Sequence, residues 1–388
     1  MQTRSSTPWS LILALWGAGL GAAAQYGKVS VIFDLLPEAY PEGGALLGFV
    51  VSLVGAVGIV FGVVAGLVVA RIRYRRALLA ALWVGAAMSA FQALLPPLPL
   101  MLLSRVFEGA SHLAIVVAAP TLIAQLSLPR DRGLTLTLWG TFFGVAFAVL
   151  AWLGRPLAMH FGVSALFLAH AAYMALFAVY LSAHLRRLPP EAPQPPFSVR
   201  QIFRDHATIY RSPRISAPAA GWLFYTFCFV SVLTVLPPFL DPAHRTMILG
   251  AMPLMSIASS MTIGVALLRF ISAVRVVEIG FALSALCVVW LWAVPGAPLA
   301  CLSLAAALGL VQGASFAAVP QLNDTAATQA QANGAMAQMG NIGNTAGTPV
   351  MAAVLLGFGY AGMPLVAGLA LAAGLAVHIF LGYLRKEG

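Results

Sequence analysis

Long stretches without a charged residue recur along the whole chain of 388 residues. Only 8% of the residues are charged and 61% are hydrophobic, whereas about a quarter of the residues in a soluble domain are charged. A soluble domain this apolar would lack the polar side chains that cover its surface. Together with a mean hydropathy of +0.93, the charge-free runs predict an integral membrane protein and exclude most classes of soluble enzyme.

Apolar runs bounded by proline, glycine and charge predict an all-α protein with twelve transmembrane helices. Most of the runs reach the roughly 20 residues that cross a bilayer. The predicted ranges are 8–35, 44–70, 76–95, 98–126, 133–154, 163–184, 215–240, 246–269, 275–294, 297–323, 332–357 and 361–384. No compelling cleavage site interrupts the first run before Gln25, so we interpret it as a retained span and not as a signal peptide.

The cations gather on one side of these helices. Of the 21 lysines and arginines, 17 fall in segments that the helix order places on one side, including the arginines of 71–76 and 186–214. By the positive-inside rule, both termini and the central loop are expected to be cytoplasmic. The basic loops that give the chain its net charge of +10 are then expected to contact anionic lipid headgroups, and we expect no nucleic-acid partner. An alanine-rich composition that prefers arginine to lysine favours a bacterial cytoplasmic (inner) membrane.

The segment 185–214 divides the chain into two predicted six-helix bundles, 1–184 and 215–388. Its proline-rich stretch at 189–196 predicts an extended linker. The residues from Ser198 onward have the form of a capping box followed by an amphipathic helix on the cytoplasmic membrane surface. An ordinary exposed linker helix is the alternative.

Two short matches indicate that the halves are repeats. Arg105–Ser111 (RVFEGAS) matches Gly309–Ser315 (GLVQGAS), and Gly66–Arg71 (GLVVAR) matches Gly264–Arg269 (GVALLR), at nearly equal spacing. Two related six-helix bundles are typical of secondary transporters, which bind their solute between the halves.

The chain resembles the major facilitator superfamily in two motifs. GLVVARIRYRR at Gly66–Arg76 is similar to the family's signature between its second and third helices, and RVFEG at Arg105–Gly109 to its fourth-helix motif. Ala70 stands where the family usually has an aspartate. The resemblance implies a gating role for four residues of the first motif, which are Gly66, Arg71, Arg75 and Arg76. The alternative is a basic loop that only fixes orientation.

Ionisable residues inside the hydrocarbon are costly and therefore informative. Lys28 and Arg105 lie in the outer parts of the first and fourth predicted helices, while Glu108 and His112 lie near the middle of the fourth, on one face. The resemblance implies that both helices line a central cavity. We predict that the two cations hold an anionic group and that Glu108 and His112 gain and lose protons. The alternative is a structural Arg105–Glu108 pair, an outward-reaching Lys28 and a His112 that only bonds a neighbouring helix.

The C-terminal half offers amides in place of charges. Gln338, Asn341 and Asn344 recur every three residues on the eleventh predicted helix, and Gln312 occupies the repeat position of Glu108. We predict that these amides contact a neutral polar part of the solute. The alternative is that they join helices to each other.

The sequence contains no phosphate-binding loop, so transport driven by ATP is not expected. Ser111 and His112 are neighbours in a helix and point in different directions, which disfavours a nucleophile–base pair and hence an enzyme. The three cysteines lack the spacing of a metal site or a disulfide framework, and we expect neither a metal nor a cofactor.

The sequence therefore predicts a monomeric secondary transporter that moves a small polar, anionic organic solute by alternating access, coupled to protons. A multispecific efflux transporter is the first alternative. A membrane sensor or scaffold that keeps the transporter frame without transporting is the second.

Overall fold

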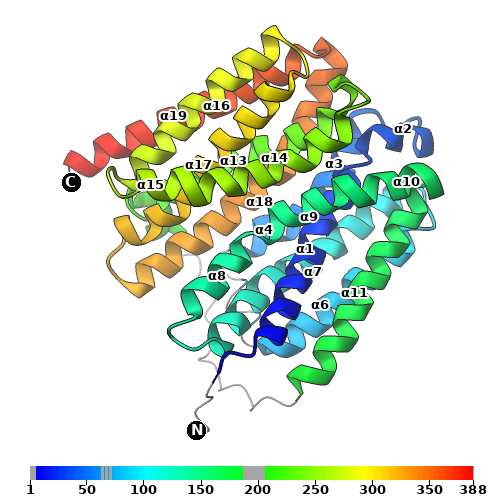
Figure 1. Ribbon diagram of the computed structural model, residues 1–388, viewed down its shortest axis with the longest axis horizontal. Coiled ribbons are helices and arrows are strands. Elements are labelled where there is room, and N and C mark those ends of the chain that lie inside the picture. Colours follow the sequence, from blue (N-terminus) through cyan, green and yellow to red (C-terminus); the bar gives the residue numbers. More distant parts are fainter. Residues whose placement is uncertain (1–5, 63–64, 66–68, 70–71, 187–205, 388) are drawn as a thin grey trace. The chain divides into compact units, whose positions relative to one another are not determined.

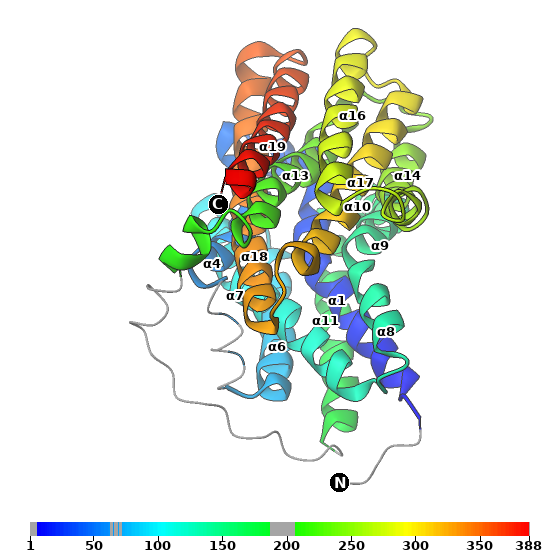
Figure 2. The same ribbon diagram turned by 90° about the vertical axis from the view of Figure 1, so that its left-hand side faces the viewer.

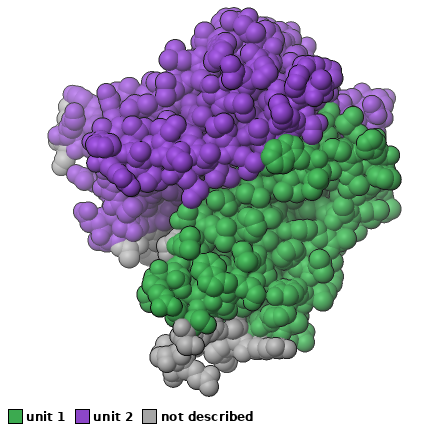
Figure 3. Space-filling view, viewed as in Figure 1, with its two compact units in different colours: residues 1–32, 64–197 green, residues 33–63, 198–388 purple. Residues whose placement is uncertain are grey.

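The structure is a computed structural model that describes residues 6–62, 65, 69, 72–186 and 206–387. It is almost entirely helical, and no strand occurs among these residues. The chain forms two compact units, coloured separately in Figure 3. Unit 1 comprises Met1–Ile32 and Val64–Phe197, and unit 2 comprises Phe33–Val63 and Ser198–Gly388. The segment Phe33–Val63 thus groups with unit 2 although it precedes the central loop. The predicted division at 185–214, most of which lies outside the described residues, stays a prediction.

Unit 1 is built from long helices and one composite helix (Figure 1). The long helices are α1 (Trp9–Ser30), α6 (Tyr74–Gln92), α7 (Leu98–Leu126) and α11 (Val163–Leu185). The composite helix consists of α8 (Arg132–Gly140), α9 (Phe142–Val149), a π-helical turn (Leu150–Gly154) and α10 (Arg155–Phe161).

Unit 2 begins with a series of short helices and continues with long ones. The short helices are 3-10 turns at Phe33–Leu35, Gly44–Leu46 and Leu53–Gly55, with α2 (Leu36–Ala39), α3 (Leu47–Ser52) and α4 (Ala56–Phe61). After α13 (Ser216–Val235) and a 3-10 turn (Pro237–Phe239) come α14 (Arg245–Ser259), a π-helical turn (Ser260–Gly264), α15 (Val265–Leu267), α16 (Ala273–Ala293), α17 (Pro298–Leu322), α18 (Ala326–Phe358) and α19 (Gly362–Glu387). The helix α16 packs against both α17 and α19, which lie beside it in Figure 2.

Every predicted helix range coincides at least in part with helix in the described residues. Within them, nine segments are long and apolar enough to cross a membrane. They are Gly44–Phe61, Leu98–Leu126, Phe142–Phe161, Val163–Leu185, Ser216–Val235, Arg245–Leu267, Ala273–Ala293, Pro298–Leu322 and Gly362–Lys386. The remaining long helices, α1, α6 and α18, are richer in glycine, alanine or polar residues. The structure therefore confirms an all-α integral membrane fold.

Local sequence signals explain where the helices begin and end. Proline opens the first turn of α7, α10 and α17, where its missing amide hydrogen costs nothing. Ser272 and Thr325 cap α16 and α18 by accepting the amide hydrogens of Arg275 and Thr328. Gly162 separates α10 from α11 at a φ of 84°, a backbone angle that side chains disfavour.

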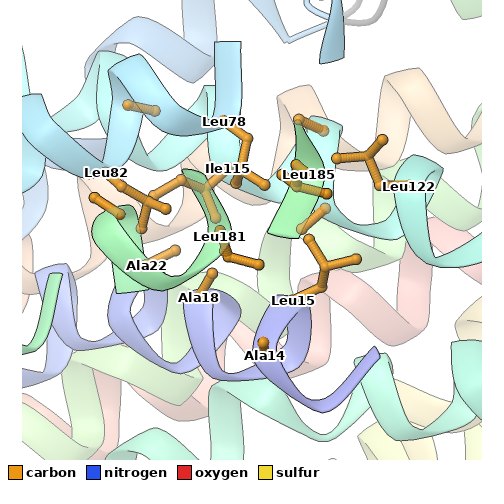
Figure 4. Packing of buried hydrophobic residues seen from close by; sticks show 14 of the residues in the cluster. Ala14, Leu15, Ala18, Ala22, Leu78, Leu82, Ile115, Leu122, Leu181 and Leu185 are labelled. Atoms are coloured by element: carbon orange, nitrogen blue, oxygen red, sulfur yellow. The ribbon is translucent and has the colours of Figure 1, made fainter. Parts of the chain in front are cut away.

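The core of unit 1 forms where α1, α6, α7 and α11 meet. Leu15 and Ala18 of α1 contact an apolar cluster that includes Leu82 of α6, Ile115 of α7 and Leu181 of α11 (Figure 4). Glycines let α11 approach α1 closely, because a Cβ on Gly17 or Gly21 would overlap the side chains of α11. This close packing brings the polar residues of the four helices together.

Candidate functional site

Six polar side chains from four helices form a buried ionic cluster in unit 1. Each of α6 and α7 contributes a pair three residues apart, which places both members on one helix face. The cluster consists of Lys28 on α1, Ser89 and Gln92 on α6, Arg105 and Glu108 on α7, and His170 on α11. Five of these side chains are inaccessible to solvent, and His170 is 5% exposed. Buried charges persist only when they are paired and hydrogen-bonded, so the contacts within the cluster decide its chemistry.

Glu108 is the centre of this cluster and has four polar contacts. Its Oε1 accepts a hydrogen bond from Lys28 Nζ at 2.6 Å and lies 3.3 Å from Ser89 Oγ. Its Oε2 accepts from Gln92 Nε2 at 2.9 Å and from the Arg105 guanidinium. The two cations and the Gln92 amide stabilise the carboxylate form of Glu108.

Arg105 also ties α7 to α1, because its second terminal nitrogen donates to the main-chain oxygen of Gln25. Lys28 does not reach outward, since its ammonium group is fully buried against Glu108. With a neutral imidazole at His170, two cations and one carboxylate leave the cluster with one surplus positive charge.

His170 is the member of the cluster that sequence reasoning missed. Its Nε2 lies 2.9 Å from the main-chain oxygen of Gly21, and its Nδ1 lies 2.7 Å from Ser89 Oγ and 3.3 Å from Lys28 Nζ. A lone histidine in an apolar helix carries no signal in the sequence that distinguishes a packed ring from a site residue. Ser89 and Gln92 were missed too, although a polar pair three residues apart in an apolar helix is a usable signal.

His112 lies beside this network without a hydrogen bond to Glu108. Its Nδ1 lies 2.9 Å from the main-chain oxygen of Ala22 on α1, and its ring meets the edge of Tyr26 at a centroid distance of 5.1 Å. Since a carbonyl oxygen only accepts, Nδ1 donates this bond. The predicted proton transfer involving His112 has no direct contact in the structure and stays a prediction.

The amides of the C-terminal half lie in unit 2. Gln338 on α18 donates to the main-chain oxygen of Ile59 at 2.8 Å and accepts from Tyr210 Oη at 2.6 Å. Asn341 donates to Ala337 one turn earlier at 2.7 Å and lies against Gly58. The two bonds of Gln338 join α18 to α4 and to the helical turn around Tyr210.

The other two amides, Gln312 and Asn344, form fewer hydrogen bonds among the described residues. Gln312 on α17 accepts from Ser256 Oγ of α14 at 3.3 Å. The Oδ1 atom of Asn344 is buried and has no hydrogen-bond partner among the described residues. The contact of all four amides with a solute stays a prediction.

The predicted gating residues are described only in part. Gly66 and Arg71 lie outside the described residues, as does Ala70. Arg75 makes a long contact of 3.5 Å with the main-chain oxygen of Leu185, and Arg76 is exposed. Their gating role stays a prediction.

Ionisable side chains buried inside a helical membrane protein indicate a functional site and are typical of membrane transporters. The family model of the Major Facilitator Superfamily matches residues 11–348, and the chain is therefore a member of that superfamily. No curated protein sequence matches it significantly.

Two solved structures with 13% sequence identity share the fold. Both are crystal structures of a bacterial homologue of the human lysosomal transporter Spinster in an inward-facing conformation, one occupied and one unoccupied. The occupied form superposes with a TM-score of 0.75 and the unoccupied form with 0.73, each over 98% of this chain and 96% of the other.

Proposed function

We propose that this chain is a secondary active transporter that moves a small polar organic solute with a negative group by alternating access, driven by the proton gradient. The observation that supports the proposal is the pair of buried cations, Lys28 and Arg105, that meet at the carboxylate of Glu108. An anionic group brought next to two buried cations would form charge-assisted hydrogen bonds, which are stronger than neutral ones.

The roles follow from the chemistry of each group. Lys28 and Arg105 attract the anionic group, while Glu108 and His112 are the proton-coupling groups that the sequence suggested. The amides Gln312, Gln338, Asn341 and Asn344 contact the neutral part of the solute. Gly66, Arg71, Arg75 and Arg76 belong to the cytoplasmic gate, in a monomer whose termini face the cytoplasm of a bacterial inner membrane.

Transport in proteoliposomes tests the proposal. A panel of radiolabelled mono- and dicarboxylates, with uncharged polyols of the same size as controls, is offered under a pH gradient of either direction. We expect one or more carboxylates to accumulate, the accumulation to disappear with a protonophore, and the polyols to stay at the level of empty liposomes. Accumulation that is equal with and without the pH gradient would contradict proton coupling, and preferred movement of polyols would contradict an anionic solute.

The substitution Glu108→Gln tests whether the cluster takes part in transport, because it keeps the shape of the side chain and removes its negative charge. We expect it to abolish accumulation driven by the gradient. The matched control is Glu278→Gln, which alters a carboxylate paired with an exposed arginine at the start of α16 and should leave transport unchanged.

A further inference from the structure

Three side chains of the buried ionic cluster form a continuous line of hydrogen bonds across three helices. Lys28 Nζ of α1 lies 2.5 Å from Ser89 Oγ of α6, and Ser89 Oγ lies 2.7 Å from His170 Nδ1 of α11. The hydroxyl group of Ser89 therefore lies between an ammonium group and an imidazole nitrogen at distances suited to proton transfer.

The direction of each bond follows from which atoms can donate. His170 Nε2 faces the main-chain oxygen of Gly21, which only accepts, so Nε2 carries the hydrogen and Nδ1 carries the lone pair. Ser89 has one hydrogen, and its contact with His170 Nδ1 is shorter than its 3.3 Å contact with Glu108. Ser89 thus donates to His170 and accepts from Lys28.

We propose that Lys28, Ser89 and His170 form a proton relay, with His170 as the group that receives the proton. An N–H bond of the Lys28 ammonium breaks as a new O–H bond forms on Ser89, and the original hydroxyl proton of Ser89 moves to His170 Nδ1. The products are a neutral amine and an imidazolium, and the total charge of the cluster is unchanged. The use of this relay in transport rests on the proposed function.

The surroundings explain why the proton goes to His170 and not to Glu108. The charged and titratable groups near the relay are Glu108 and Arg105 of α7, with His112 further along the same helix. Glu108 keeps Arg105, Gln92 and Ser89 as neighbours whether or not Lys28 is charged, so in this conformation it stays ionised while the proton moves along the relay.

The position of the proton then decides how α1 is held. With the proton on Lys28, an ion pair joins α1 to α7. With the proton on His170, this ion pair is replaced by a weaker bond between a neutral amine and a carboxylate. A proton that moves between α1 and α11 therefore changes the bonds that hold α1 in the bundle.

Nuclear magnetic resonance of the full chain in lipid nanodiscs tests the relay without any solute. The chain has only two lysines, Lys28 and Lys386, so ¹⁵N-lysine labelling gives two side-chain signals, with Lys386 as the reference. Histidine labelling gives a His170 signal that is assigned by its loss in His170→Gln. We expect the Lys28 ammonium and the neutral His170 imidazole to be the major form, and a hydrogen of Lys28 to exchange with His170 Nδ1 through Ser89.

A matched pair of variants isolates the hydroxyl group. Ser89→Thr and Ser89→Val have nearly the same size, and only threonine keeps a hydroxyl group. We expect proton exchange between Lys28 and His170 to stay within about twofold of wild type in Ser89→Thr and to slow at least tenfold in Ser89→Val. Glu278→Gln, which alters a carboxylate outside the cluster, should leave the exchange unchanged.

Two results would overturn the relay. One is the absence of hydrogen exchange between Lys28 and His170 Nδ1 at every pH at which the protein is folded. The other is equal exchange rates in the two Ser89 variants. A transport rate that does not depend on the pH gradient would instead contradict the proposed function, and it would not contradict the relay. The two failures are therefore distinguishable.

Discussion

At the scale of single residues, the charges of the buried ionic cluster depend on one another. Glu108 forms ion pairs with both Lys28 and Arg105 inside unit 1. Removing one partner of a buried ion pair leaves an uncompensated charge in a medium that solvates it poorly. The cluster is thus a point at which a small chemical change has a large effect on stability.

Glu108→Gln is expected to lower the free energy of unfolding by about 3–5 kcal/mol, because it strands two buried cations. The control, Glu278→Gln, breaks a pair whose Arg275 partner is 66% exposed and should cost about 0–1 kcal/mol. Denaturant unfolding of the purified proteins in detergent, followed by circular dichroism, measures both. Equal losses in the two variants would contradict the structural importance of the cluster.

A second residue-scale prediction concerns the exposed pair before α14. A hydrogen bond from His244 at 2.6 Å and a second from the amide of Ala243 lower the pKa of the Asp241 carboxyl. Because the pKa is lower in the folded chain, the ionised carboxylate favours the folded loop above the unfolded value of about 3.9, and this contribution is lost as the pH falls through the folded pKa.

His244→Ala should therefore raise the pKa of Asp241 toward its ordinary value. The measurement is a carbon NMR titration of labelled aspartates, of which the chain has five. His160→Ala, at an exposed histidine elsewhere, is the control and should change nothing. An unaltered titration in His244→Ala would mean that the amide of Ala243 alone lowers the pKa.

The residues of the cluster differ in how far the sequence could predict them. Lys28, Arg105 and Glu108 were predictable because a charge inside an apolar run is rare and demands a partner. His170 was not, because a lone histidine is common in packed helices, and Ser89 carries a signal only together with Gln92 on the same face of its helix. Their role arises only from the close approach of α6 and α11, which depends on contacts between residues far apart in the sequence.

At the scale of helices, the close packing of α18 against α13 depends on glycines, which have no side chain. Gly340, Gly343 and Gly347 fall on the face of α18 that meets α13. A Cβ at Gly347 would overlap the main chain of Phe227, whereas a Cβ at Gly357 of the same helix would meet nothing within 4 Å. The hydrophobic effect does not drive helices together inside a lipid bilayer. Membrane helices therefore associate through close van der Waals packing, which small residues allow.

Gly347→Ala should destabilise the protein by about 1–3 kcal/mol, because main chain cannot move aside as a side chain can. Gly357→Ala should be neutral or stabilising by up to about 1 kcal/mol, since alanine favours a helix over glycine. Thermal unfolding of both variants in the same detergent gives the comparison. A Gly347→Ala variant as stable as wild type would show that α18 and α13 are not in close contact.

At the scale of the whole molecule, the sequence predicts helices more directly than it predicts how they group. Apolar length alone predicts a membrane helix, and every predicted range overlaps helix among the described residues. The grouping of Phe33–Val63 with unit 2 was not predictable, because it depends on long-range bonds such as Thr345 Oγ1 to Ser52 O at 3.2 Å and Gln338 Nε2 to Ile59 O at 2.8 Å. Nothing in either local sequence identifies its distant partner.

The orientation of the chain in the membrane is the remaining whole-molecule prediction. The segment Arg245–Leu267 is long and apolar enough to cross the bilayer, and the loops at its two ends differ in charge. The loop that contains the 84% exposed Phe270 lies between Arg269 and Arg275, whereas at the loop of Ala243 the charge of Asp241 balances that of Arg245. The positive-inside rule therefore places Phe270 in the cytoplasm and Ala243 outside.

Cysteine labelling tests this orientation in a background with Cys228, Cys287 and Cys301 replaced by alanine. A membrane-impermeant maleimide added to intact cells should label Ala243→Cys and not Phe270→Cys. In inside-out vesicles the result should be reversed. Labelling of both positions from one side would mean that this segment does not cross, and the reverse pattern would place both termini outside.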